Sequence, residues 1–186
     1  PRFVAYKMPK MAGAAVGSAD GVGFYYLDAI DKAAFKPSPV AISSPNQAIG
    51  YTLNQFFKNQ GDKALLHVFY NDEPAVASPL MHAAANLTGG KPVFENGHTK
   101  GVVLFDEKSG TGVWIIHSVP KFPPPAGQQY AYPDSGHIYG QTFICMTLPT
   151  AILKTIGTTL FYTRADIYSV NMPQWAKTLS PDLVKV

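Results

Sequence analysis

Apolar residues alternate with polar ones, or run together in short blocks, along six stretches of this chain. In an extended strand successive side chains point to opposite faces, so such stretches are typical of β-strands. We expect strands near residues 3–7, 23–27, 65–70, 100–105, 113–118 and 139–147.

Two further stretches carry apolar residues at helical spacing. Pro45 stands at the start of the first, which runs to about residue 58 and places Ile49, Leu53 and Phe56 on one face. The second follows Pro149. This order of elements predicts an α/β fold in which helices flank a central mixed β-sheet.

Length and composition favour one globular domain over residues 1–186. A chain of 186 residues can bury roughly 70% of its unfolded surface. No apolar run approaches the length of a bilayer span, so we expect no membrane partner. The net charge of +3 is mild and is compatible with a polyanionic partner without indicating one.

The chain has a single cysteine, Cys145, within an apolar strand, so no intrachain disulfide can form. We expect this thiol to be buried and inert. Two segments, 75–95 and 121–136, are rich in small residues, glycine or proline. They are expected to be ordered surface loops beside the site.

The strongest candidate chemistry lies in the stretch that begins Gly97-His98-Thr99-Lys100-Gly101. Alternation along a strand puts His98 and Lys100 on one face, an arrangement that suits an oxyanion such as phosphate. His117 follows on the next apolar strand. A surface histidine, an edge-strand lysine and a core histidine are the structural alternatives for these three residues.

Several blocks, in this order and spacing, resemble the amino-terminal half of the deoxyribonuclease II family. Besides the His-Thr-Lys-Gly stretch they are Tyr6-Lys7-Met8-Pro9, Tyr26-Leu27-Asp28, Ser44-Pro45, Tyr70-Asn71-Asp72, the His117-Ser118-Val119-Pro120 run with its following prolines, and Tyr139-Gly140-Gln141-Thr142. Together they span most of the chain. The family in turn is similar to phospholipase D enzymes, so the resemblance implies one phospholipase D-like module.

The resemblance implies a metal-independent, acid-favoured endonuclease that cleaves DNA and leaves 3′-phosphate ends. In it one histidine attacks phosphorus, a second protonates the leaving oxygen, and lysines bind the phosphate oxygens. His98 is then the expected nucleophile and Lys100 the phosphate clamp. His117 is expected to orient the reacting groups and Ser118 to donate to phosphate, while Tyr139 and Gln141 share a strand face that lines the cleft.

Two halves, each with a His-x-Lys motif, form one active site in the resembled enzymes, whereas this chain contains one such motif. The second set is expected from the same precursor, a separate fragment or another copy. No cofactor or metal is expected, because the histidine spacings match no zinc motif. The alternatives are a DNA-binding half that is inactive alone and a phospholipase-like phosphodiesterase.

Two departures from the resembled pattern change details. Phospholipase D enzymes have an acidic residue five positions after the lysine, but Phe105 stands there and Asp106 follows, so we assign Asp106 to a hairpin turn. Animal members have a cysteine where this chain has His137, which points to a bacterial or otherwise disulfide-poor relative. Secretion or a periplasmic location is expected for a bacterial protein, and a lysosomal one for a eukaryotic protein.

Overall fold

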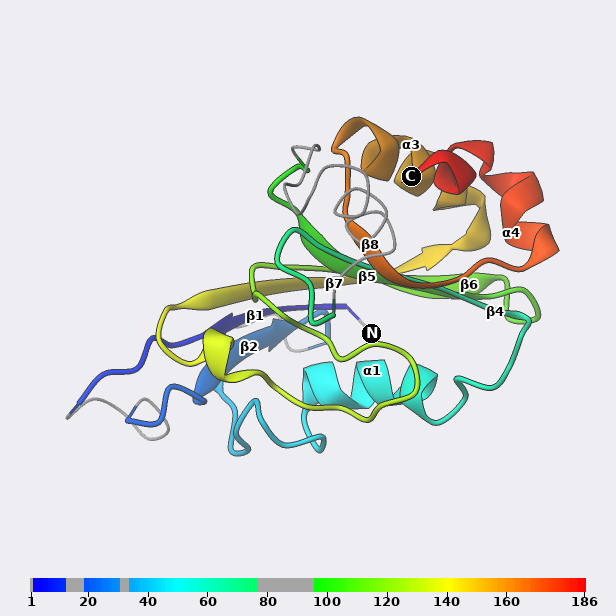
Figure 1. The fold of residues 1–186 in the computed structure, drawn as a ribbon. Coiled ribbons are helices and arrows are strands. Elements are labelled where there is room, and N and C mark those ends of the chain that lie inside the picture. Colours follow the sequence, from blue (N-terminus) through cyan, green and yellow to red (C-terminus); the bar gives the residue numbers. More distant parts are fainter. Residues whose placement is uncertain (1, 13–18, 31–33, 77–95) are drawn as a thin grey trace, which may run out of the picture.

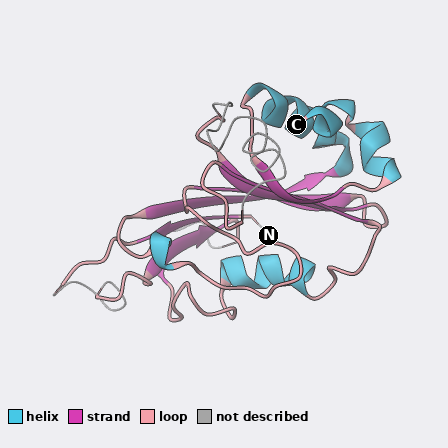
Figure 2. Ribbon diagram, in the orientation of Figure 1, coloured by secondary structure: helices cyan, strands magenta, loops and turns pink. Residues whose placement is uncertain are grey.

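The fold is an eight-stranded sheet between two layers of helices, seen in a computed structural model that describes residues 2–12, 19–30, 34–76 and 96–186 (Figures 1 and 2). The strands are β1 (Phe3–Lys7), β2 (Phe24–Asp28), β3 (Lys36–Pro37), β4 (Leu65–Asn71), β5 (Lys100–Asp106), β6 (Thr111–His117), β7 (Gln141–Pro149) and β8 (Ile167–Asn171). Their order across the sheet is β3-β2-β1-β7-β6-β5-β4-β8.

Helix α1 covers one face of the sheet, and α3 and α4 cover the other (Figure 1). The helices are α1 (Ala48–Phe57), α3 (Leu153–Tyr162) and α4 (Gln174–Leu179), with 3-10 turns η1 (Asp134–Gly136), η2 (Thr150–Ile152) and η3 (Pro181–Lys185). Among the helices of the described ranges, none is long and apolar enough to cross a membrane.

The α/β class is confirmed, but the expectation of a mixed sheet is wrong. Every ladder between neighbouring strands is antiparallel. Parallel neighbours require a crossover that returns the chain to the end at which it started. Helix α3 is such a crossover, because the successive antiparallel pairs leave β7 and β8 running in the same direction. However, β8 joins the sheet beside β4 and not beside β7, so the helix did not indicate a parallel pair.

Each face of the sheet has its own apolar core, and this explains the unbroken apolar run in β5. Val102 and Leu104 pack on the α1 side with Leu53 and Phe56. Val103 and Phe105 pack on the α3 side with Leu153, Ile156 and Leu160. A strand that is buried on both faces has apolar side chains at successive positions, and the sequence of β5 has this pattern.

All six predicted strands are present, with bounds within two residues of those expected. Both predicted helices form, although the second begins with the η2 turn before α3. Strand β8 was not predicted, because Ser169 and Asn171 interrupt its apolar pattern. The short β3 and α4 were also not foreseen.

The two expected surface loops have different outcomes. Most of the 75–95 segment lies outside the described residues. The 121–136 segment is a loop around η1, as expected, but it does not lie wholly on the surface. Phe122 is fully buried and packs on the rings of Tyr132 and Phe143, so the start of this loop is part of the core on the α1 side.

Candidate functional site

Five buried polar side chains lie at one end of the sheet, one on each of five neighbouring strands. They are Asn71 at the end of β4, Lys100 at the start of β5, His117 at the end of β6, Gln141 at the start of β7 and Lys7 at the end of β1. Each lies two residues beyond an apolar side chain that faces α1, so all five share that face. We call this set the polar row.

Asp72 connects the predicted histidine and lysine. Its Oδ2 accepts a hydrogen bond from Nδ1 of His98 at 2.7 Å, and its Oδ1 accepts a short one from Nζ of Lys100. Burial alone would raise the pKa of Asp72, but the hydrogen bonds and charges of Lys100 and His98 outweigh it and keep that pKa below its ordinary value. The carboxylate is therefore ionised, and it neutralises an ammonium whose side chain is only 3% exposed.

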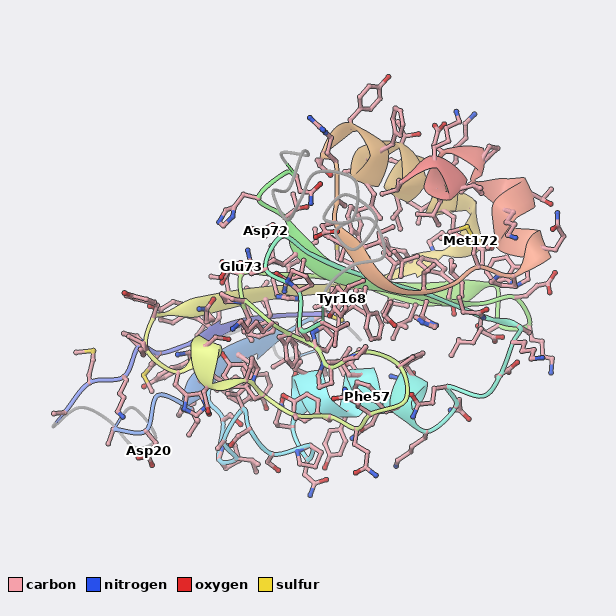
Figure 3. The ribbon with its side chains drawn as sticks, viewed as in Figure 1. Asp20, Phe57, Asp72, Glu73, Tyr168 and Met172 are labelled. Carbon is pink, nitrogen blue, oxygen red and sulfur yellow. The ribbon has the colours of Figure 1, made fainter. Side chains whose placement is uncertain are left out.

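His98 is brought beside Lys100, although not in the way the sequence suggested. The strand begins at Lys100, and His98 lies in a bend before it, with 86% of its side chain exposed. With Asp72 accepting at Nδ1, a neutral ring presents the lone pair of Nε2 to solvent. Figure 3 shows Asp72 and Glu73 beyond the end of β4, on the opposite side of the molecule from Met172.

His117 is almost fully buried at the end of β6, beside Lys100 in the extended register of β5 and β6. Its Nδ1 accepts the backbone N–H of Val119 at 3.2 Å, so Nε2 carries the hydrogen of the neutral ring. Burial, with a further contribution from the Lys100 charge, lowers the pKa of His117 to about 3. Nε2 has no hydrogen-bond partner among the described residues, so this buried donor is unused.

A second buried histidine lies at the opposite end of the sheet. His67 packs between the rings of Phe56 and Phe69, and its Nε2 lies 3.3 Å from the Ser169 hydroxyl. Burial lowers the pKa of His67 to about 4.

These two histidines predict a loss of stability in acid. The unfolded chain takes up a proton at each of them as the pH falls below about 6.5, whereas the folded chain does not. Stability is therefore fully present above that pH and decreases toward the folded pKa, by about 1–2 kcal/mol for His67 between about pH 6.5 and pH 5. Calorimetry across this range should show a falling Tm, and His67→Phe should flatten the slope; a Tm independent of pH would contradict the prediction.

Ser118, the residue after β6, lies beside Gln141 at the start of β7. The Ser118 hydroxyl donates to Oε1 of Gln141 at 2.5 Å and accepts the backbone N–H of Thr142 at 3.0 Å. Lys7, opposite Gln141 in the β1–β7 register, donates to the His137 carbonyl at 2.8 Å, and burial lowers its pKa to about 8. Ser118 is exposed and so is open to a ligand, whereas Gln141 and Lys7 are buried.

Tyr139 does not share a strand face with Gln141, and that expectation is wrong. Strand β7 begins at Gln141, and Tyr139 lies in a bend before it with 72% of the residue exposed. Gly140 separates the two and lies so close to Tyr6 that a Cβ there would meet the phenol oxygen at 2.6 Å. The backbone bends at Tyr139, before the strand begins, so the alternation of the strand does not extend to Tyr139.

The assignments of Asp106 and Cys145 agree with the structure. Asp106 ends β5 at the opposite end from Lys100 and accepts the backbone N–H of Ser109 at 2.9 Å, so it closes the hairpin turn. Cys145 is buried, and burial raises the pKa of its thiol to about 12. Neither side chain is part of the polar row.

Sequence reasoning missed Asp72, Asn71 and Lys7. A signal was present, because Asn71 and Lys7 each close an apolar strand with a polar side chain on its inward face. Within the described ranges, no group of three or more histidine, cysteine, aspartate or glutamate side chains is arranged to bind a metal ion. The site is therefore an ion pair, an exposed imidazole and a buried imidazole N–H donor, an arrangement suited to a phosphate ester.

Comparison with known proteins gives one consistent result. The family model described as Deoxyribonuclease II matches residues 2–186. Deoxyribonuclease-2 of Caenorhabditis elegans is 43% identical over 197 residues, which cover 98% of this chain and 52% of that protein. Plancitoxin-1 of Acanthaster planci is 34% identical, covering 98% and 47%, and deoxyribonuclease-2-alpha of Mus musculus is 32% identical, covering 99% and 48%. The chain thus spans about half the length of these relatives.

Proposed function

Because the chain belongs to the deoxyribonuclease II family, we propose that it supplies one half of the active site of an endonuclease that hydrolyses DNA without a metal ion. The observation that supports this most directly is the carboxylate of Asp72 between His98 and Lys100. It places an exposed imidazole nitrogen, which can attack a phosphodiester, beside the ammonium of Lys100, which can donate hydrogen bonds to the phosphate oxygens.

In the proposed reaction Nε2 of His98 attacks the phosphorus atom. Asp72 accepts the Nδ1–H hydrogen, which keeps the lone pair on Nε2 and stabilises the positive charge that the ring gains. A nitrogen–phosphorus bond forms while the bond to the 5′ oxygen breaks, and that oxygen leaves with a proton. Water then cleaves the phosphohistidine, which releases the histidine and leaves a 3′-phosphate end.

Lys100 and His117 are proposed to bind the phosphoryl oxygens. The Lys100 ammonium supplies charge, and Nε2–H of His117 supplies a neutral hydrogen bond in a buried setting, where such bonds stabilise developing charge most. With a pKa of about 3, His117 is neutral at weakly acidic pH, so it is not the general acid that protonates the leaving oxygen. Ser118 is proposed to contact a phosphate oxygen, and Tyr139 and Gln141 to line the cleft for DNA.

In this scheme the general acid that protonates the leaving oxygen is not one of the residues described above. The sequence has one His-x-Lys motif and spans about half of its relatives. We propose that a second half with its own His-x-Lys motif, in the same precursor, in a separate fragment or in a second copy, provides the protonated histidine. This is the arrangement of phospholipase D-like enzymes. Because the second histidine has to be protonated, activity is favoured in acid, and we propose a lysosomal or secreted location.

The substrate and products test this proposal. The chain is incubated in a metal chelator with plasmid DNA or with phosphatidylcholine vesicles, and the DNA ends are analysed. We expect DNA cleavage whose 3′ ends a polymerase extends only after phosphatase treatment. Ends that are extended directly, or release of choline or phosphatidic acid in place of DNA cleavage, would contradict it. DNA binding without cleavage would mean that the second half has to be supplied from elsewhere.

A further inference from the structure

Asn71 is a fully buried amide next to Asp72, and neither the proposed chemistry nor the comparisons give it a role. All of its side-chain hydrogen-bonding groups contact backbone. Nδ2 donates to the carbonyl oxygens of Val119 at 3.0 Å and Phe122 at 3.1 Å, and Oδ1 accepts the N–H of Glu73 at 2.9 Å. One side chain therefore joins the end of β4 to the loop that follows His117.

The Nδ2 group of Asn71 anchors the loop that follows His117, and this loop holds the His117 ring. Residues 118–122 form no strand or helix, and Lys121 has a left-handed φ of 59°. Besides the two bonds from Asn71, the N–H of Lys121 donates to the carbonyl of Glu73, two residues after β4, at 2.7 Å. The Val119 N–H in turn donates to Nδ1 of His117. The direction of the His117 Nε2–H bond thus depends on where the loop is anchored.

The Oδ1 atom of Asn71 fixes the conformation of the backbone at Asp72. Because Oδ1 of Asn71 accepts from the N–H two residues later, it closes an Asx turn around Asp72. That turn sets the direction of the carboxylate that binds His98 and Lys100. Asn71 is also paired with Lys100 in the β4–β5 register and donates its own N–H to the Asp166 carbonyl at 2.8 Å.

We propose that Asn71 is the positioning residue of the site, because its amide sets His117 and Asp72 at fixed places relative to each other. This inference rests on the proposed function only for its effect on cleavage. An amide is required here, since both Nδ2 hydrogens are used. A carboxylate of the same shape would place an oxygen against the Val119 and Phe122 carbonyls.

The chain offers a matched control at the other end of the sheet. Asn171 donates from Nδ2 to the carbonyls of Lys63 at 3.1 Å and Leu65 at 2.8 Å, and it is paired with His67 in the β4–β8 register. Asn71→Asp and Asn171→Asp therefore remove the same kind of anchor, one beside His117 and one beside His67. The imidazole 15N resonances of the two histidines report each environment without any need for cleavage.

We expect Asn71→Asp to shift the nitrogen resonances of His117 and leave those of His67 unchanged, and Asn171→Asp to do the reverse. In the cleavage assay Asn71→Asp should lower kcat by about 10- to 100-fold with little change in KM, because reacting groups displaced by a fraction of an ångström still bind DNA. Asn171→Asp should leave both constants unchanged.

Unshifted His117 resonances in Asn71→Asp, or equal loss of cleavage in both variants, would overturn the proposal. If the isolated wild-type chain cleaves no DNA, the second half has to be supplied from elsewhere, and the resonances alone decide the role of Asn71. If Asn71→Asp does not fold, Asn71→Ala carries the same test, since its smaller side chain leaves room for water at the two carbonyls.

Discussion

Asp72→Asn is expected to lower DNA cleavage by about 100- to 10,000-fold, the range found when a carboxylate that orients a catalytic histidine loses its charge. The variant retains the shape of the side chain but no longer fixes which nitrogen of His98 carries the hydrogen. It also leaves the buried Lys100 ammonium without its counter-charge, which costs about 3–5 kcal/mol of folding free energy. Nicking rates and denaturant unfolding measure the two effects.

Asp182→Asn is the matched control for this variant. Asp182 also pairs with a lysine, Lys185 at 2.8 Å, and accepts the Thr158 hydroxyl at 2.9 Å, but the pair lies at the surface on η3. Solvent screens an exposed pair of this kind, so stability and cleavage should hardly change. If Asp72→Asn changed the nicking rate and the stability as little as Asp182→Asn, Asp72 would neither orient His98 nor stabilise Lys100.

Lys100→Met is expected to lower cleavage by about 100- to 1,000-fold, because it removes the charge proposed to stabilise the phosphoryl group. It should also raise the pKa of His117, since the Lys100 charge contributes to lowering it. Because the pKa of Asp72 is lowered by Lys100 as well, that pKa should rise toward its ordinary value. Nicking rates and NMR titration of His117 measure these changes.

The double variant Asp72→Asn/Lys100→Met separates stability from catalysis. It has no unpaired buried charge, so it should be more stable than Asp72→Asn while remaining equally inactive. Lys185→Met, which removes an exposed partner of Asp182, should change neither cleavage nor the His117 titration. Cleavage by Lys100→Met at the wild-type rate would exclude Lys100 from the site.

The strands could be predicted because their apolar pattern is local. The run Val102 to Phe105 indicates a strand whichever neighbours it has, and the structure then buries it on both faces. The pairing of strands is not local. The sequence between β7 and β8 does not indicate that β8 pairs antiparallel with β4 at the edge of the sheet.

The site was predictable to a similar extent. His98 and Lys100 are two residues apart, so their proximity could be read from spacing. Asp72 lies 26 residues from His98 along the chain, and the contact exists only because β4 and β5 pair so that Asn71 meets Lys100. A single sequence does not specify that register, and it also does not show that His117 is buried with an unused N–H.

Plasmid nicking in a metal chelator, from about pH 4 to about pH 8 across the histidine titration range, tests the central claim most directly. The wild-type chain is compared with His98→Asn at a concentration high enough for two copies to meet. Binding of the plasmid without nicking would mean that the second half must be supplied from elsewhere. The account predicts chelator-resistant nicking that is strongest in acid and absent in His98→Asn. Equal nicking by both chains, or nicking that stops in chelator and returns with magnesium, would contradict it.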